Sequence, residues 1–284
     1  SIFPDSSVKN LVICVTGRGE SKDFSTLISD CMPELKILYN SQCFPLYLYE
    51  KSENDIIDFD DLFSSSDDKK FNNGYVRKDG VSDAGLTHFK QFYPNESISK
   101  EDVFYYIYGL LHSQDYRDRY SDNLTKELPR IPCVKNSKNF WVFSQAGRDL
   151  AELHINYETV DCYPVTLEEN GELLFGDESY YVTKMKFIKK DDKTAVVYNN
   201  HITIKDIPLE AYDYIVNGKP ALEWIMERQA VTTDKKSGIV NDANLWATET
   251  MGNAKYPLEL FQRVITVSLE TMKIVNALPE LDID

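Results

Sequence analysis

The sequence predicts an α+β fold in which helical segments pack with an antiparallel β-meander. Helical and strand-like patterns come in blocks rather than in strict alternation. Residues 99–158 carry apolar side chains at helical spacing, and residues 180–207 hold three consecutive strand-like runs. With 284 residues, 42% of them hydrophobic, the chain is long enough to bury a full core.

The first 74 residues are predicted to be rich in β-structure. The apolar runs "NLVICVTG" (10–17) and "CFPLYLYE" (43–50) indicate two strands, and the acidic, polar segment 52–74 is expected to be a long mobile connection. We therefore expect a β-rich part, residues 1–74, followed by a part with helices and the meander, residues 75–284. The two parts are also compatible with one domain.

Capping residues predict where the helices begin. Ser99 is a predicted N-cap with Asp102 three residues later, and a second helix is expected to begin near Ser113 and to end at Pro129. A third helix, "SQAGRDLAELHINYE", is expected to be capped by Ser144.

The meander is predicted over residues 180–190, 194–200 and 201–207, with "DDK" and "NN" as turns. Gly218 is expected to close a helix over residues 209–218, and Pro220 to open the next one. The last two helices are expected at residues 220–229 and 257–278.

The net charge argues against a self-sufficient nucleic-acid binder. A formal charge of -15 and a pI near 4.8 give a long-range field that repels phosphate. Binding to nucleic acid would then require local basic patches or a neighbouring basic domain.

Composition also predicts the cellular compartment in which the chain acts. The five cysteines are scattered without a C-x-x-C pair, which is typical of reduced thiols in a cytosol. The sequence has no signal-peptide pattern and no apolar run of 18 residues. We expect a cytoplasmic domain that is part of a longer polypeptide.

Motifs for catalysis, metals and nucleotides are missing from the sequence. "TGRGESK" has neither a dinucleotide-binding nor a P-loop spacing, and no G-x-S-x-G elbow occurs. The four histidines are isolated in sequence, and a packing role is expected for His154. We therefore expect no catalysis, no metal and no cofactor in this chain.

Basic residues form islands in the acidic chain. Residues 115–138 hold six basic against four acidic residues, and residues 184–193 hold five lysines against two aspartates. Single exposed lysines are usually solubility residues. Together, islands that converge in the fold would contact DNA, with arginine suited to guanine and asparagine to adenine.

Several stretches together resemble a known family. "FYYIYGLLHSQDYRDRYSDNLTKELPRIP", "FWVFSQAGRDLAELHINYE", "YPLELFQRVITVSLETMKIV" and "VNGKPALEWIMERQAVTTDKKSGIVNDAN" are similar to the C-terminal specificity region of type ISP restriction-modification enzymes. So is the earlier "GRGESKDFSTLISD…NSQCFPLYLYE". The resemblance covers nearly the whole chain.

The resemblance implies a target-recognition domain that reads a short asymmetric DNA sequence. It implies a parent polypeptide with a nuclease, an ATP-driven motor and an upstream adenine-N6 methyltransferase, to which residues 1–74 would join. S-adenosylmethionine, ATP and Mg²⁺ would bind those parts and not this chain. The net acidity departs from a self-sufficient DNA binder, and suggests that the methyltransferase supplies much of the phosphate affinity.

On this basis we expect two sets of contacts with double-stranded DNA. Backbone phosphates would be bound by Arg18, Lys22, Arg117, Arg119, Arg130, Lys135, Lys138, Lys184 and Lys186. Bases would be read by residues in turn-like places: Asn199, Asn200, Lys235, Lys236, Asn241 and Asn244.

Two alternatives remain open at the level of sequence. The chain could be an interaction module that clamps methyltransferase to motor without touching bases, which its acidity and tyrosine-rich helices favour. It could also be an independent enzyme whose site is assembled from distant residues.

Overall fold

The chain divides into two compact units. A computed structural model describes residues 1–19, 23–34, 36–51, 70–71, 74–169 and 176–283. Unit 1 comprises Ser1–Ile155 and Ala277–Asp284, and unit 2 comprises Asn156–Asn276. Both units mix helices with small antiparallel sheets, as the sequence predicts.

Unit 1 begins with two three-stranded antiparallel sheets. In the first sheet, the fully buried β1 (Val12–Val15) lies between β2 (Thr26–Ser29) and β3 (Gln42–Pro45). The second has the order β4 (Tyr47–Lys51), β6 (Tyr75–Asp79), β5 (Lys70–Phe71). Leu46 separates β3 from β4, so the predicted strand 43–50 is divided between two sheets.

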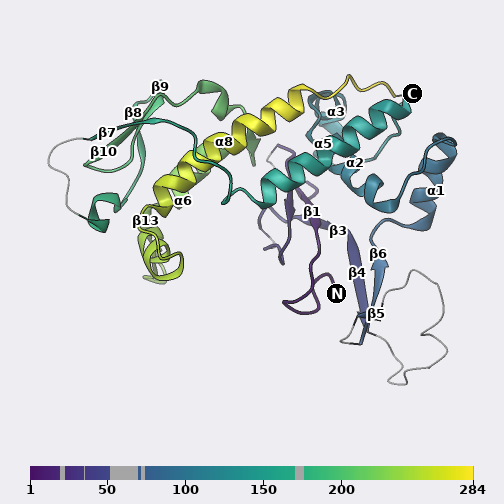
Figure 1. Cartoon of the computed structure of the whole chain (residues 1–284), viewed down its shortest axis with the longest axis horizontal. Helices are drawn as coiled ribbons and strands as arrows, with labels where there is room; N and C mark the ends of the chain where they lie inside the picture. Colours follow the sequence, from purple (N-terminus) through teal and green to yellow (C-terminus); the bar gives the residue numbers. More distant parts are fainter. Residues whose placement is uncertain (20–22, 35, 52–69, 72–73, 170–175, 284) are drawn as a thin grey trace. The chain divides into compact units, whose positions relative to one another are not determined.

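The helices of unit 1 pack through two glycines. Helices α2 (Lys100–His112) and α5 (Ser137–Ile155) run side by side (Figure 1). A Cβ atom on Gly109 would lie 2.2 Å from the Phe143 carbonyl oxygen, and one on Gly147 would lie 1.9 Å from that of Tyr105. The remaining helices are α1 (Asp83–Phe92), α3 (Gln114–Arg119) and α4 (Ser121–Leu124).

Unit 2 is built on a four-stranded antiparallel sheet with the order β7-β10-β9-β8. Its strands are β7 (Thr166–Glu169), β8 (Lys186–Lys189), β9 (Asp192–Val197) and β10 (Ile202–Lys205). Helices α6 (Ala221–Arg228) and α8 (Tyr256–Asn276) contribute Leu222, Met226 and Phe261 to the core on this sheet.

Short elements connect the sheet and helices of unit 2. Two hairpins are formed, one by β11 (Ile215–Val216) and β12 (Lys219–Pro220), the other by β13 (Val231–Thr233) and β14 (Val240–Asp242). The others are η2 (Asp177–Tyr180), η3 (Leu209–Tyr212), α7 (Ala243–Leu245) and the π-helical turn η4 (Trp246–Thr250).

Most capping predictions are confirmed. Ser99 and Asp102 form a reciprocal capping box at the start of α2, and Ser113 caps α3. Pro220 directly precedes α6. The predicted meander is confirmed as β8, β9 and β10, with β7 added at its edge.

Three helix predictions are wrong. The single helix expected from Ser113 to Pro129 is divided at Tyr120 into α3 and α4, and α4 ends at Leu124. The helix expected to be capped by Ser144 is α5, which begins at Ser137; the buried Ser144 hydroxyl instead donates to the Asp102 carbonyl oxygen at 2.9 Å. The helix expected over residues 209–218 is one 3₁₀ turn followed by a hairpin. Asn217 and Gly218 both have positive φ, which makes them a turn between strands rather than a helix end.

For other expectations from the sequence, the structure tests only a part or nothing. Of the segment expected to be a mobile connection, residues 52–69 and 72–73 lie outside the described residues. The division at residues 74 and 75 stays a prediction. In the part of the chain that the structure describes, no helix is long and apolar enough to span a membrane.

The glycine contact between α2 and α5 generates a stability prediction. We expect Gly147→Ala to lower the free energy of unfolding by about 3 kcal/mol, because the methyl group meets backbone that cannot move without separating the helices. Gly85→Ala in α1 is the control, since its Cβ would meet nothing closer than 3.4 Å and alanine favours a helix. Urea denaturation measures both, and equal stability of the two variants would contradict the account.

Two histidines of unit 1 meet in its interior. The His112 and His154 rings are 5.4 Å apart, His112 Nδ1 lies 2.9 Å from the Tyr108 carbonyl oxygen, and His154 Nδ1 lies 2.6 Å from the Tyr108 hydroxyl. The packing role predicted for His154 is thereby confirmed. Burial lowers the pKa of His154 to about 3; burial and the nearby Arg117 charge also lower the pKa of His112.

These histidines predict a pH dependence of stability. The unfolded chain protonates them near pH 6.5 and the folded chain does not, so stability is retained above that pH and falls below it. We expect His154 alone to remove about 2 kcal/mol between pH 7 and pH 5. Denaturation at both pH values should show a smaller loss in His154→Gln, whereas His88→Gln, at an exposed position, should match the wild type. Equal losses in all three proteins would contradict this.

Candidate nucleic-acid interface

Two segments of unit 1 that carry predicted basic residues contact one another. The loop after β1, which carries Arg18, is joined to the end of α4 by a hydrogen bond from the Gly19 amide to the Thr125 carbonyl oxygen at 3.1 Å. The Arg117 guanidinium lies 5.9 Å from the centre of the Phe24 ring. These contacts bring the segment that carries Arg18 close to the segment that carries Arg117.

The structure separates the cations of this set that have a partner in the protein from those that have no ion pair in the part of the chain that it describes. Arg117 is half-buried and donates from Nε to the Leu111 carbonyl oxygen at 2.7 Å, which is a scaffold contact. Arg130 and Lys135 are exposed but have ion-pair partners: Arg130 pairs with Glu127 at 2.9 Å, and Lys135 with Asp282 at 3.3 Å.

Three exposed cations of unit 1 remain: Arg18, Arg119 and Lys138 have no ion pair within the described residues. Lys22 lies outside those residues. The exposed cations are therefore the members of the predicted set best placed to meet a phosphate.

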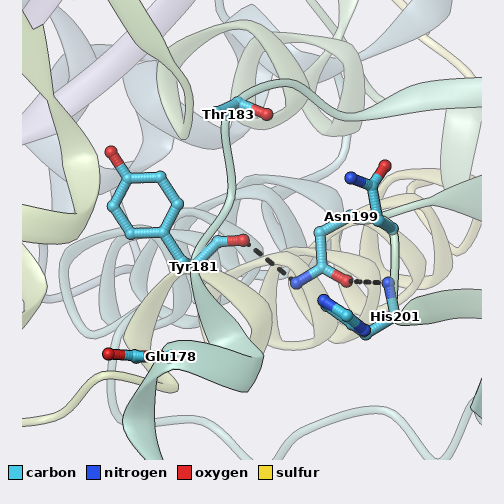
Figure 2. Close-up of a pocket in the computed structure, with 6 residues that line it drawn as sticks. Glu178, Tyr181, Thr183, Asn199 and His201 are labelled. Carbon is cyan, nitrogen blue, oxygen red and sulfur yellow. Dashed lines mark hydrogen bonds between the residues drawn. The ribbon is translucent and has the colours of Figure 1, made fainter. Parts of the chain in front are cut away.

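Unit 2 contains a pocket of about 470 Å³ at the turn between β9 and β10 (Figure 2). It is lined by side chains from η2, from the chain that follows η2, and from the turn. These are Glu178, Tyr181, Thr183, Asn199, Asn200 and His201. Two predicted base readers, Asn199 and Asn200, thus belong to one pocket.

One wall of the pocket is held by Asn199. Its buried Nδ2 donates to the carbonyl oxygens of Ser179 at 2.8 Å and Tyr181 at 3.0 Å. Its Oδ1 accepts from the amides of His201 at 2.9 Å and Ile202 at 2.8 Å. Asn199 thereby closes the turn and ties it to the neighbouring segment, so its amide has no capacity left for a base.

Asn244 also binds the backbone of the chain that follows η2. Its Oδ1 accepts from the Val182 amide and its Nδ2 donates to the Val182 carbonyl oxygen, both at 2.9 Å. The Asn244 side chain is buried and is also bonded to Asp242 at 2.7 Å. This second predicted base reader is therefore a structural residue as well.

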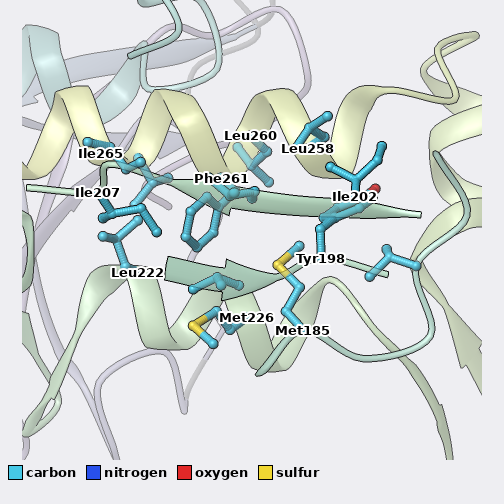
Figure 3. Packing of buried hydrophobic residues seen from close by; sticks show 14 of the residues in the cluster. Met185, Tyr198, Ile202, Ile207, Leu222, Met226, Leu258, Leu260, Phe261 and Ile265 are labelled. Carbon is cyan, nitrogen blue, oxygen red and sulfur yellow. The ribbon is translucent and has the colours of Figure 1, made fainter. Parts of the chain in front are cut away.

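The turn that lines the pocket is flanked by residues of the hydrophobic core of unit 2. Tyr198 is buried and donates from its hydroxyl to the Tyr180 carbonyl oxygen at 2.6 Å. Figure 3 shows Tyr198 and Ile202 in the same cluster as Leu258 and Phe261 of α8. The turn that carries Asn200 is consequently anchored at both ends.

The other predicted residues of unit 2 are exposed. Lys184 follows the pocket residue Thr183, and Lys186 begins β8. Lys235 and Lys236 lie at the tip of the β13–β14 hairpin, where Asp234 accepts from the Lys236 and Ser237 amides. Asn241 lies in β14, one residue before the Asp242 that caps α7.

Four pocket residues were missed from the sequence. His201 directly follows the "NN" turn, which was a usable signal. Glu178, Tyr181 and Thr183 lie between β7 and β8 and have no motif around them. The Tyr181 hydroxyl donates to Asp242 at 3.0 Å, and this hydrogen bond raises the pKa of Tyr181.

Within the described ranges, no group of three or more His, Cys, Asp or Glu side chains could hold a metal ion. The free polar groups of the pocket are one carboxylate, one amide, one hydroxyl and one imidazole. Such groups can bind a polar, hydrogen-bonding ligand.

Truncating the two neighbouring asparagines is expected to change the free energy of unfolding by different amounts. We expect Asn199→Ala to lower the free energy of unfolding by about 2–3 kcal/mol, because it leaves buried carbonyl and amide groups unpaired. We expect Asn200→Ala to change it by under about 0.5 kcal/mol, because Asn200 is exposed. Thermal denaturation measures both, and a stable Asn199→Ala variant would refute the scaffold role.

Comparison with known proteins identifies the family. Residues 1–262 match the model of the Type ISP C-terminal specificity domain. No curated protein matches the chain.

Three solved structures are similar over almost the whole chain. A nuclease-deletion mutant of the Type ISP restriction-modification enzyme LlaGI, in complex with a DNA substrate mimic, is 36% identical with a TM-score of 0.76 over 100% of this chain. The ATP-dependent Type ISP restriction-modification enzyme LlaBIII, bound to DNA, is 35% identical with a TM-score of 0.81 over 100%. A cryoEM structure of a DrdV–DNA complex is 30% identical with a TM-score of 0.76 over 98%.

This chain spans 22%, 17% and 26% of the lengths of those three chains, respectively. The resemblance seen in the sequence is confirmed by the family match and by the similarity of fold. The chain belongs to the Type ISP C-terminal specificity domain family.

Proposed function

We propose that this chain is the sequence-specific DNA-recognition domain of a type ISP restriction-modification enzyme. The observation that carries the proposal is the match to the specificity-domain family, together with three similar structures that are complexes with DNA. In this proposal the domain selects the target, and adenine-N6 methylation and ATP-dependent cleavage are performed by domains outside this chain.

The arrangement of side chains supports a division of labour between the two units. Exposed cations of unit 1, led by Arg18, Arg119 and Lys138, would contact phosphates. The pocket of unit 2, with Asn200 on its rim, would contact bases. The net charge of -15 opposes unassisted binding, so the methyltransferase of the same polypeptide would supply part of the phosphate affinity.

In this proposal, the cofactors bind to domains outside this chain. S-adenosylmethionine would bind the methyltransferase, and ATP with Mg²⁺ would bind the motor. The domain would act in the cytoplasm, where its polypeptide meets double-stranded DNA.

A second candidate is an interaction module that joins the methyltransferase to the motor without reading bases. One observation favours it: Ile239, Val240, Leu245 and Trp246 are all more than half exposed within eight residues. Exposed apolar groups of this kind mark protein interfaces. Such a module would leave the choice of DNA sequence to another domain.

The proposed function predicts selection of a short asymmetric motif. The chain, alone and joined to its methyltransferase, would be mixed with a randomised duplex pool at low and moderate salt, and the retained DNA sequenced. We expect one motif to be enriched. Binding by the joined protein without any enrichment would favour the interaction module and contradict sequence recognition.

The phosphate contacts predict a change in salt dependence. We expect the combined Arg18→Gln, Arg119→Gln and Lys138→Gln substitutions to weaken binding to all sequences. The slope of log affinity against log salt should become shallower by about 0.9 for each phosphate that the variant no longer neutralises. Lys273→Gln is the control, because it removes one exposed cation from an ion pair with Glu270 in α8. An unchanged slope in the triple variant would exclude these residues from the interface.

A further inference from the structure

In the pocket of unit 2, hydrogen bonds within the protein fix some polar side chains and leave others without a partner among the described residues. Asn199 is consumed by four hydrogen bonds to backbone, and the Tyr181 hydroxyl is held by Asp242. By contrast, the side chains of Glu178, Thr183, Asn200 and His201 make no hydrogen bond or ion pair with any described residue. A surface that fixes its walls and leaves its donors and acceptors open is preorganised for a ligand.

The charges around the pocket decide what kind of ligand fits. Glu178 lines it, and neither a lysine nor an arginine does. A carboxylate repels phosphate, so the pocket is unsuited to the DNA backbone. Among the groups that DNA presents, those that suit this pocket are neutral and donate hydrogen bonds to a carboxylate.

The base edges of DNA include such donors. The major-groove edge of cytosine presents the N4 amino group, and that of adenine presents the N6 amino group beside the N7 acceptor. Aspartate and glutamate accept from cytosine N4, and asparagine pairs with adenine N6 and N7. Guanine and thymine present oxygen acceptors to the major groove, which a carboxylate repels.

We propose that this pocket is a base-specificity site that receives an adenine or cytosine through its exocyclic amino group. Glu178 accepts from that amino group, Asn200 supplies the neighbouring amide contact, and Asn199 is a positioning residue that holds the turn. This inference rests on the proposed function, since it names the bases that the recognition domain selects.

Figure 2 shows how the side chains suit this role. Tyr181 and Glu178 lie on one side of the pocket, and His201 lies on the other side with Asn199. The Tyr181 ring, whose hydroxyl is fixed 3.0 Å from Asp242, provides a flat wall, while Glu178 and Asn200 are both exposed at the surface. Both side chains are therefore accessible to a ligand from the surface.

The test compares base preferences of four proteins against the randomised duplex pool: wild type, Glu178→Gln, Asn200→Ala and the control Glu210→Gln. Each would be used both as the 284-residue chain and joined to its methyltransferase. Glu210 is an exposed carboxylate in η3 that does not line the pocket. Urea denaturation verifies that each variant is folded, as expected for exposed positions.

The inference predicts a change at one base pair. The wild type should prefer adenine or cytosine at that position by roughly 10-fold or more. Glu178→Gln should then accept guanine or thymine there, because a glutamine amide can also donate, and Asn200→Ala should reduce the preference at the same position. Glu210→Gln should keep the wild-type motif.

Other outcomes distinguish a failure of this inference from a failure of the proposed function. If wild type enriches a motif and both pocket variants enrich the same motif unchanged, the inference is overturned and the proposed function stands. A uniform loss of affinity in the pocket variants, without a change of base preference, overturns it as well. If the wild type enriches no motif in either form, the proposed function fails, and the inference fails with it.

Discussion

The segment 179–183, which runs from the end of η2 toward β8, depends mainly on side chains for the hydrogen bonds of its backbone carbonyl groups. Asn199 donates to the carbonyl oxygens of residues 179 and 181, and Asn244 binds both the amide and the carbonyl of residue 182. Tyr198 donates to the carbonyl oxygen of residue 180, and the Val231 amide donates to that of residue 183. Because buried backbone groups must be paired, these contacts hold the segment between the meander and the β13–β14 hairpin. The position of the pocket follows from them.

The acidity of the chain is compatible with DNA recognition when charges are considered locally. The pocket contains a carboxylate and no cation, which is unfavourable for phosphate and suitable for an amino group of a base. The exposed cations Arg18, Arg119 and Lys138 belong to unit 1. In the proposed function the domain contributes discrimination. Its relatives in DNA complexes are chains about four to six times longer, as the covered shares of 17–26% indicate.

Local sequence signals were sufficient for elements with strong caps and clear periodicity. Ser99 and Asp102 predicted the start of α2, and the β-branched runs predicted the meander, because these features act within a few residues. The start of α5 was missed because Ser144, a good cap by type, is used in tertiary packing against α2. The helix expected at residues 209–218 failed because Asn217 and Gly218 form a hairpin turn, which their neighbours do not reveal.

The sequence indicated a turn that lines the candidate pocket, but not which of its side chains are free to bind. The turn at residues 199–200 was predicted as a place for base readers, and it does line the pocket. Sequence alone does not show that Asn199 and Asn244 turn inward, since that depends on a segment 18 residues away from one and 62 away from the other. Glu178 has no local signal, because its importance comes from its position beside the turn.

The most direct test of sequence recognition is an exchange of domains. This chain would replace the matching segment of LlaBIII, and the DNA sequence modified by the hybrid would be determined by sequencing. The account predicts that the hybrid modifies a new target, set by this chain, in place of the target of LlaBIII. A hybrid that folds, remains active and still modifies the LlaBIII target would contradict the account, and would assign sequence choice to another part of the enzyme.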